Sequence, residues 1–174
     1  MTHEYLSTTT LGCLRDTQPC REGWAKLLAH LGKTKADDES LPLLTILDIN
    51  GLGDALRCLD EDPELDRLKR HFQAWCAEQL LALFEAESPG DMRVRDQIAM
   101  LRRDDASDAD RDAARSAARA AAWAAVSDAA RAAAWAAAWA AAGDAAGAAV
   151  GDAAWAAARA AQEKQLRAMM EKKQ

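Results

Sequence analysis

The tract from about residue 108 to residue 162 constrains the fold most, because it repeats a unit of four residues about thirteen times. More than half of the tract is alanine, the residue with the highest helix propensity because it loses no side-chain entropy. We therefore predict α-helix. Every fourth position carries arginine, tryptophan, serine or glycine: Arg111, Arg115, Arg119, Trp123, Ser127, Arg131, Trp135, Trp139, Gly143, Gly147, Gly151, Trp155 and Arg159.

A period of four does not match the 3.6 residues of a helical turn, so each position drifts by about 40° per unit. One straight helix of about fifty residues would also be about 75 Å long, too long for a compact domain of this size. We therefore predict a break, either at Ser127-Asp128 or, preferentially, at Gly143, Gly147 and Gly151. The alternative is an intact helix whose glycines form a groove for another backbone.

Four tryptophans of the tract are large enough to compensate for the small area that alanine buries. Each can bury about 150–250 Å², so we expect them to pack between the tract and the N-terminal half. The alternative is an exposed tryptophan–arginine surface that stacks on nucleotides or on a partner. The four are Trp123, Trp135, Trp139 and Trp155.

The first 106 residues contain several short stretches with helical periodicity. Pro19 suits the first position of a helix, Gly32 its end, and Ser40 the cap of a helix with Pro42 in its first turn. Asn50-Gly51 ends that helix, and Asp62-Pro63 begins the longest one, which runs to about Ala86. A short helix around Val94–Leu101 precedes Ser107 and Asp110, which resemble a capping box for the tract.

No stretch alternates with a period of two, so strands are not expected. We predict an all-α fold, a bundle of short N-terminal helices packed with close-packed alanine-rich C-terminal helices. The latter would form a hairpin or one long bent helix. The predicted division is an N-terminal helical domain over residues 1–106 and the alanine-rich repeat region over residues 107–174.

Composition excludes several classes of function. A net charge of −6 and a pI near 5.1 argue against general binding of nucleic acid or of anionic membranes. Neither a signal peptide nor a transmembrane segment is recognisable, and the four cysteines are dispersed, so we expect a cytoplasmic protein with free thiols.

No arrangement of residues predicts catalysis or metal binding. The histidines His3, His30 and His71 lack the spacing of metal ligands. The glycines at 51 and 53 follow no predicted strand, so they indicate a helix-terminating turn rather than a phosphate-binding loop. We predict no catalytic residue, no metal and no cofactor.

The segment from Asp37 to Asp66 is strongly acidic, with a net charge of −9 against +3 for the rest of the chain. Such carboxylates can simply solvate loops and favour helix N-termini. They can also form a docking face for a basic partner, because charge steers association and selects the partner. The predicted partner-binding residues are Asp37, Asp38, Glu39, Asp54, Asp60, Glu61, Asp62, Glu64 and Asp66.

Three runs in a fixed order resemble a family of bacterial and phage proteins. They are CREGWAKLLAHLGKTKADD (residues 20–38), NGLGDALRCL (residues 50–59) and WCAEQLLALF (residues 75–84), followed by the tail rich in alanine, tryptophan and arginine. The family is that of the all-α immunity proteins associated with polymorphic toxin systems. The resemblance implies an inhibitor that binds a protein, and it implies no catalytic residue.

We therefore expect a non-enzymatic inhibitor that neutralises a toxin or an effector nuclease through an acidic face, without direct contact to nucleic acid or membrane. A phage inhibitor of host defence, similar in role to an anti-CRISPR protein, is the nearest alternative. A second alternative is a structural protein that forms homo-oligomers, of which a homodimer is the smallest. A third alternative is an enzyme.

Overall fold

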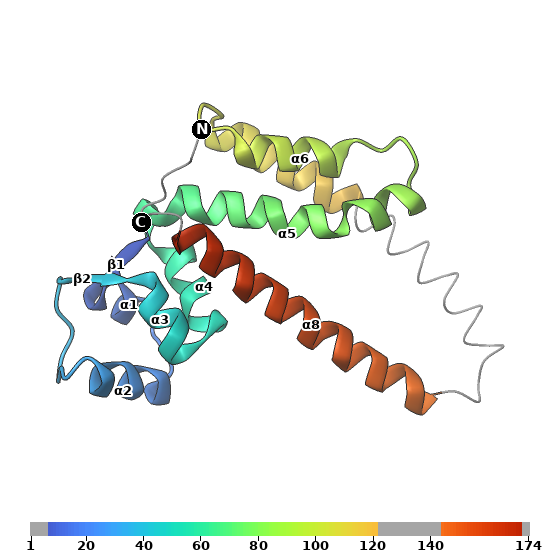
Figure 1. Cartoon of the computed structure of the whole chain (residues 1–174). Helices are drawn as coiled ribbons and strands as arrows, with labels where there is room; N and C mark the ends of the chain where they lie inside the picture. The colour runs from blue at the N-terminus through green and yellow to red at the C-terminus, as the bar shows by residue number, and fades with distance from the viewer. Residues whose placement is uncertain (1–6, 122–143, 172–174) are drawn as a thin grey trace. The chain divides into compact units, whose positions relative to one another are not determined.

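The computed structural model describes residues 7–121 and 144–171, and it is 75% helical. The described residues form nine helices and one small sheet (Figure 1). They divide into two compact units, which we call unit 1 (Met1–Lys69 and Arg159–Gln174) and unit 2 (Arg70–Ala158). The prediction of a mainly helical protein is confirmed. The predicted domain boundary between residues 106 and 107, which follows the change in composition, stays a prediction.

Unit 1 contains a two-stranded antiparallel sheet of β1 (Thr8–Thr10) and β2 (Ser40–Pro42), in which Thr9 pairs with Leu41. The prediction that the chain has no strands is therefore wrong. Each strand is only three residues long, too short to show an alternating pattern, although β-branched threonine favours an extended chain. The prediction that Ser40 caps a helix is also wrong, because Ser40 lies in β2 and pairs with Thr10.

The remaining N-terminal elements of unit 1 are helical. Gly32 and Gly51, with φ of 65° and 84°, follow two of these helices, which confirms both predicted ends. Pro19 and Pro42 precede helices rather than lying in their first turns, so those two predictions are wrong. The helices are α1 (Leu11–Asp16), α2 (Arg21–His30), α3 (Leu43–Asn50), α4 (Leu52–Glu61) and the 3₁₀-helix η1 (Pro63–Leu65).

Large aliphatic side chains form the core of unit 1, where α3 packs against α2 and α4. The C-terminal end of α8 (Asp144–Glu171) contributes Leu166 to this core, and Arg167 pairs with Asp48 of α3 at 2.6 Å. Burying each such side chain stabilises the fold by about 1.5–3 kcal/mol. The largest fully buried side chains among the described residues are Leu11, Leu14, Leu27, Leu43, Ile46, Leu47, Cys58, Leu65, Leu68 and Leu166, and all belong to unit 1.

Unit 2 contains most of α5 (Asp66–Glu87), α6 (Arg93–Arg102) and the helix over residues 108–121. Ala74, Ile98 and Leu101 are buried together between α5 and α6. The first turn of the tract helix has the predicted capping box, since the Asp110 amide donates to Ser107 Oγ at 3.1 Å and the Ser107 amide donates to Asp110 Oδ2 at 3.4 Å.

The alanine tract is helical over residues 108–121 and again in α8. Because Gly147 and Gly151 lie inside α8, the preferred prediction of a helix break is wrong at these two residues. Alanine-rich neighbours supply enough helix propensity to offset the cost of about 1 kcal/mol for each glycine. The other predicted break points and the four tryptophan side chains of the tract lie outside the part that the structure describes.

Candidate functional site

The nine predicted partner-binding residues all lie in unit 1, and they differ in exposure. The side chains of Asp37, Asp54, Asp62 and Asp66 are half-buried, whereas those of Asp38, Glu39, Asp60, Glu61 and Glu64 are exposed. The acidic segment therefore combines carboxylates that hold the fold together with others that face solvent.

Asp62 connects the sheet to the helices of unit 1. Its carboxylate accepts a hydrogen bond from Thr9 Oγ1 at 2.8 Å, and Thr9 is only 4% exposed. The other carboxylate oxygen accepts from the Glu64 amide at 3.0 Å and so caps η1, which confirms the predicted role of Asp62-Pro63. A structural role accounts for this side chain without any partner.

Asp54 has a second structural role, at a close approach between helices. Its carboxylate accepts from Asn50 Nδ2 at 2.7 Å, and the same amide group donates to the carbonyl oxygen of Gly23 at 3.1 Å. A Cβ atom at position 23 would lie 2.9 Å from Asp54 Oδ2, so the Asp54 carboxylate would have to shift to admit a larger residue there. We therefore no longer count Asp54 among the residues suited to docking.

Lys33 holds Asp37 and Glu39, with its Nζ 2.7 Å from a carboxylate oxygen of each. The hydrogen bond from Lys33 lowers the pKa of the Asp37 carboxyl below its ordinary value of 3.8, and the same hydrogen bond raises the pKa of Lys33. Asp60 similarly lies 3.5 Å from Lys69 Nζ. Local cations therefore partly neutralise these three carboxylates.

An open cavity of 570 Å³ brings together three acidic residues from two separate parts of the acidic segment, Asp38, Asp62 and Glu64. None of the described residues that line it is basic. The sequence reasoning missed the neutral part of the lining, for which the run of threonines was the only signal. That part consists of Thr8, Thr9, Thr10, Cys13, Ser40 and Pro63.

The thiol in this cavity is poorly suited to nucleophilic catalysis. Burial is the main cause that raises the pKa of Cys13, although a hydrogen bond with Thr9 lowers it. Burial also raises the pKa of Cys58 in α4 to about 12. A catalytic cysteine needs a lowered pKa so that the thiolate is present at neutral pH. The described residues also include no cluster of histidine, cysteine and carboxylate groups that could hold a metal ion.

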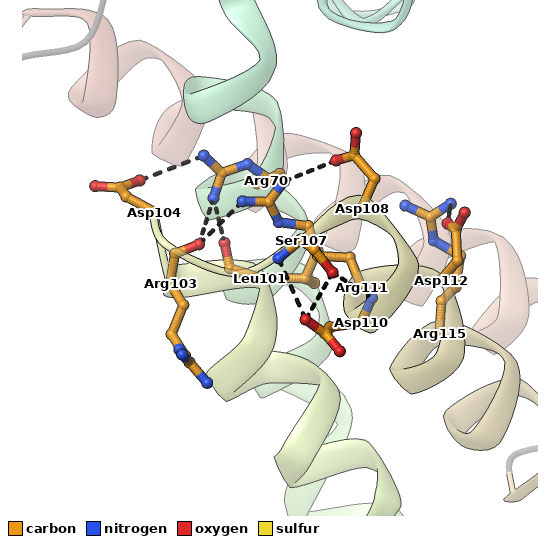
Figure 2. Close-up of polar contacts among 10 residues, drawn as sticks. All are labelled: Arg70, Leu101, Arg103, Asp104, Ser107, Asp108, Asp110, Arg111, Asp112 and Arg115. Carbon is orange, nitrogen blue, oxygen red and sulfur yellow. Dashed lines mark hydrogen bonds and ion pairs between the residues drawn. The ribbon is translucent and has the colours of Figure 1, made fainter.

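A polar cluster in unit 2 surrounds Arg70, which is 7% exposed (Figure 2). Its guanidinium donates to the carbonyl oxygens of Leu101 at 3.0 Å and Arg103 at 3.2 Å, and it pairs with Asp104 at 3.3 Å. Arg111 of the tract helix also donates to the carbonyl of Arg103, at 3.2 Å. We call this cluster the Arg70 joint. It satisfies the carbonyl groups at the end of α6 and so has a structural role.

No family model, curated protein or solved structure matches the chain at a significant level. Among the described residues, no helix has the combination of length and apolar character needed to cross a membrane.

Proposed function

We propose that the chain is a non-enzymatic inhibitor that binds a basic protein, such as a toxin or an effector nuclease, through the acidic surface of unit 1. The observation that carries the proposal is the convergence of Asp38, Asp62 and Glu64 on one open cavity, with no basic side chain among the described residues that line it. We define the acidic surface as the exposed carboxylates of Asp38 and Glu64, which line this cavity, together with Glu61, which precedes Asp62 in the chain. Asp62 holds the cavity wall in place.

The three carboxylates of the acidic surface are exposed, and none forms an ion pair with another described residue. A free carboxylate loses no intramolecular partner when it meets a cation of another protein. Uncompensated negative charge also accelerates the encounter with a positively charged surface and disfavours acidic partners. Enzymes that act on nucleic acids present such positive surfaces to phosphate groups, so they are suitable targets.

The same surface would serve an inhibitor of host defence encoded by a phage. The chemistry of recognition is shared, because both kinds of target are basic proteins. Genes adjacent to this one distinguish the two roles: a toxin gene favours an immunity role, and a phage operon favours anti-defence.

The test is affinity capture from extracts of the source organism with the full chain as bait, followed by mass spectrometry. We compare wild-type bait with the triple variant Asp38→Lys/Glu61→Lys/Glu64→Lys. The expected result is that a basic protein captured by the wild type is lost with the triple variant. Capture by the wild type should also weaken as salt is added, because exposed charges are screened within about 10 Å at 0.1 M salt.

A matched control carries the same change in net charge on exposed residues elsewhere, in the variant Glu22→Lys/Asp96→Lys/Glu171→Lys. This control should keep the basic protein. If the triple variant keeps every partner, or if the control loses the same protein, the acidic surface is not the docking face. Circular dichroism of all three baits checks that each is folded.

A further inference from the structure

Unit 2 has a groove that the proposed function does not use. It has a volume of 350 Å³, near the lower end of the range of about 300–1,000 Å³ that is typical of ligand sites. Three helices line it at helical spacings: α5 with Ala77, Leu80 and Phe84, α6 with Val94 and Gln97, and the helix over residues 108–121 with Arg115, Ala118 and Arg119.

The floor of the groove is apolar and open to solvent. Leu80 is 62% exposed. Among the described residues, Leu80 and Met92 are the two exposed large hydrophobic side chains, and Leu80 is the more exposed of them. It lies one turn from Phe84 on α5, so the two side chains form a continuous apolar strip with Val94. Covering such side chains is favourable by about 25 cal/mol for each Å² of apolar area removed from water. An exposed strip of this kind often marks an interaction surface.

Two guanidinium groups border this strip. Arg115 and Arg119 are one helical turn apart, which corresponds to about 6 Å along the helix axis. Arg115 pairs with Asp112 at 3.2 Å, and both side chains are more than half exposed. Arg119 is exposed and forms no ion pair with another described residue. The border of the groove therefore carries positive charge that the described residues of unit 2 compensate only in part.

We propose that this groove binds an amphipathic helix of a protein partner, with large apolar residues on one face and carboxylates beside them. The apolar face would cover Leu80 and Phe84, as in other complexes where a helix occupies a groove. Carboxylates four residues apart on the partner helix match the spacing of Arg115 and Arg119, and arginine binds carboxylates with two parallel hydrogen bonds.

Charge complementarity selects this occupant over a basic one. A helix with lysines at the same positions would place like charges opposite the two arginines, and this arrangement is disfavoured. The groove thus has a charge opposite to that of the acidic surface of unit 1, so the two surfaces would bind different classes of partner.

The test uses full-length protein and three fluorescent synthetic peptides of about four helical turns. The first peptide carries leucine and phenylalanine on one face, flanked by glutamates four residues apart. The second replaces the glutamates by lysines, and the third is a scrambled version of the first. Fluorescence anisotropy should show the glutamate peptide binding at least about tenfold more tightly than either of the others.

Two variants locate the binding in the groove. Leu80→Asp should weaken the glutamate peptide at least about tenfold, because it places a charge in the apolar strip. Arg119→Glu should weaken the glutamate peptide and strengthen the lysine peptide. The control is Met92→Asp, which changes an exposed hydrophobic residue outside the groove, 50% exposed, and should leave all three affinities unchanged. Because Leu80, Arg119 and Met92 are exposed, each variant is expected to fold.

Three results would overturn the proposal. The first is no binding of the glutamate peptide up to about 1 mM, since the groove would then be filled or unsuitable. The second is equal binding of all three peptides. The third is a wild-type dimer in analytical ultracentrifugation that Leu80→Asp converts to a monomer, because a second copy of the chain would then be the occupant.

Discussion

The two units of this chain are both helical, yet the described parts of their interiors bury different kinds of side chain. Unit 1 buries large aliphatic side chains and leaves most of its carboxylates at the surface. Among the described residues of unit 2, the buried groups include the cluster of Ala74, Ile98 and Leu101 and the guanidinium of Arg70. Apolar burial is therefore expected to dominate the stability of unit 1, and unit 2 is expected to depend more on specific hydrogen bonds.

The largest effect that separates the units should come from truncating a core leucine. Leu43 is fully buried in unit 1, and Leu43→Ala should lower the free energy of unfolding by about 3–5 kcal/mol because it removes apolar contacts and leaves a cavity. Ala74→Gly is the counterpart in unit 2, where it should cost only about 1 kcal/mol. Urea denaturation followed by circular dichroism measures both. Equal losses would contradict the contrast between the two interiors.

The next effect tests the polar side of the comparison. Arg70→Ala leaves the carbonyl oxygens of Leu101 and Arg103 without this donor and should destabilise unit 2 by about 2–3 kcal/mol. Amide hydrogen exchange should become faster in α6 and in the helix over residues 108–121. Arg102→Ala is the control, because its ion pair with Glu78 is exposed and should contribute less than about 1 kcal/mol. If the Arg70 variant were as stable as this control, the Arg70 joint would not contribute to the stability of unit 2.

How far these features could be read from the sequence depends on how local their causes are. The ends at Gly32 and Gly51, the cap at Asp62 and the capping box at Ser107 were all predicted, because each depends on a few neighbouring residues. The sheet was missed because β1 and β2 are separated by some thirty residues and are stabilised by their pairing.

The candidate site shows the same limit. Sequence reasoning identified the acidic segment, but it could not separate structural carboxylates from free ones. Asp54 is held by Asn50 in the adjacent helix α3, and Asp62 by Thr9 at a separation of 53 residues. Such contacts exist only once the chain has folded. The Arg70 joint was missed for the same reason, since its partners lie more than thirty residues along the chain.

A smaller effect concerns the start of the tract helix in unit 2. Ser107→Ala removes the side-chain oxygen that accepts from the Asp110 amide and should destabilise the helix over residues 108–121 by about 1 kcal/mol. Ser116 is exposed in the middle of the same helix, where alanine is the better helix former, so Ser116→Ala should be neutral or slightly stabilising. Hydrogen exchange of this helix distinguishes the two. Effects of the same sign would mean that the cap does not fix the helix start.

The smallest effect should come from the partly exposed ion pair of Lys33 and Asp37 in unit 1, and it is best detected through the pH dependence of stability. Lys33→Met removes the hydrogen bond that lowers the pKa of Asp37, so that pKa should rise toward 3.8. A carboxyl whose pKa is lowered in the folded state stabilises the fold above its unfolded pKa, and this stabilisation is lost as pH falls through the folded value. The wild type should therefore exceed the variant in stability near pH 7, and the difference should vanish at a pH below the folded pKa of Asp37.

Carbon-13 titration of the Asp37 carboxyl by NMR gives the pKa directly, and urea midpoints at the two pH values give the stability difference. Lys35→Met is the matched control, since Lys35 contributes least to lowering the pKa of Asp37. A pKa that is unchanged in Lys33→Met would mean that another group holds this carboxylate. A stability difference as large as that of Arg70→Ala would contradict the comparison itself, because a partly exposed ion pair in unit 1 would then stabilise the fold as much as the buried guanidinium does in unit 2.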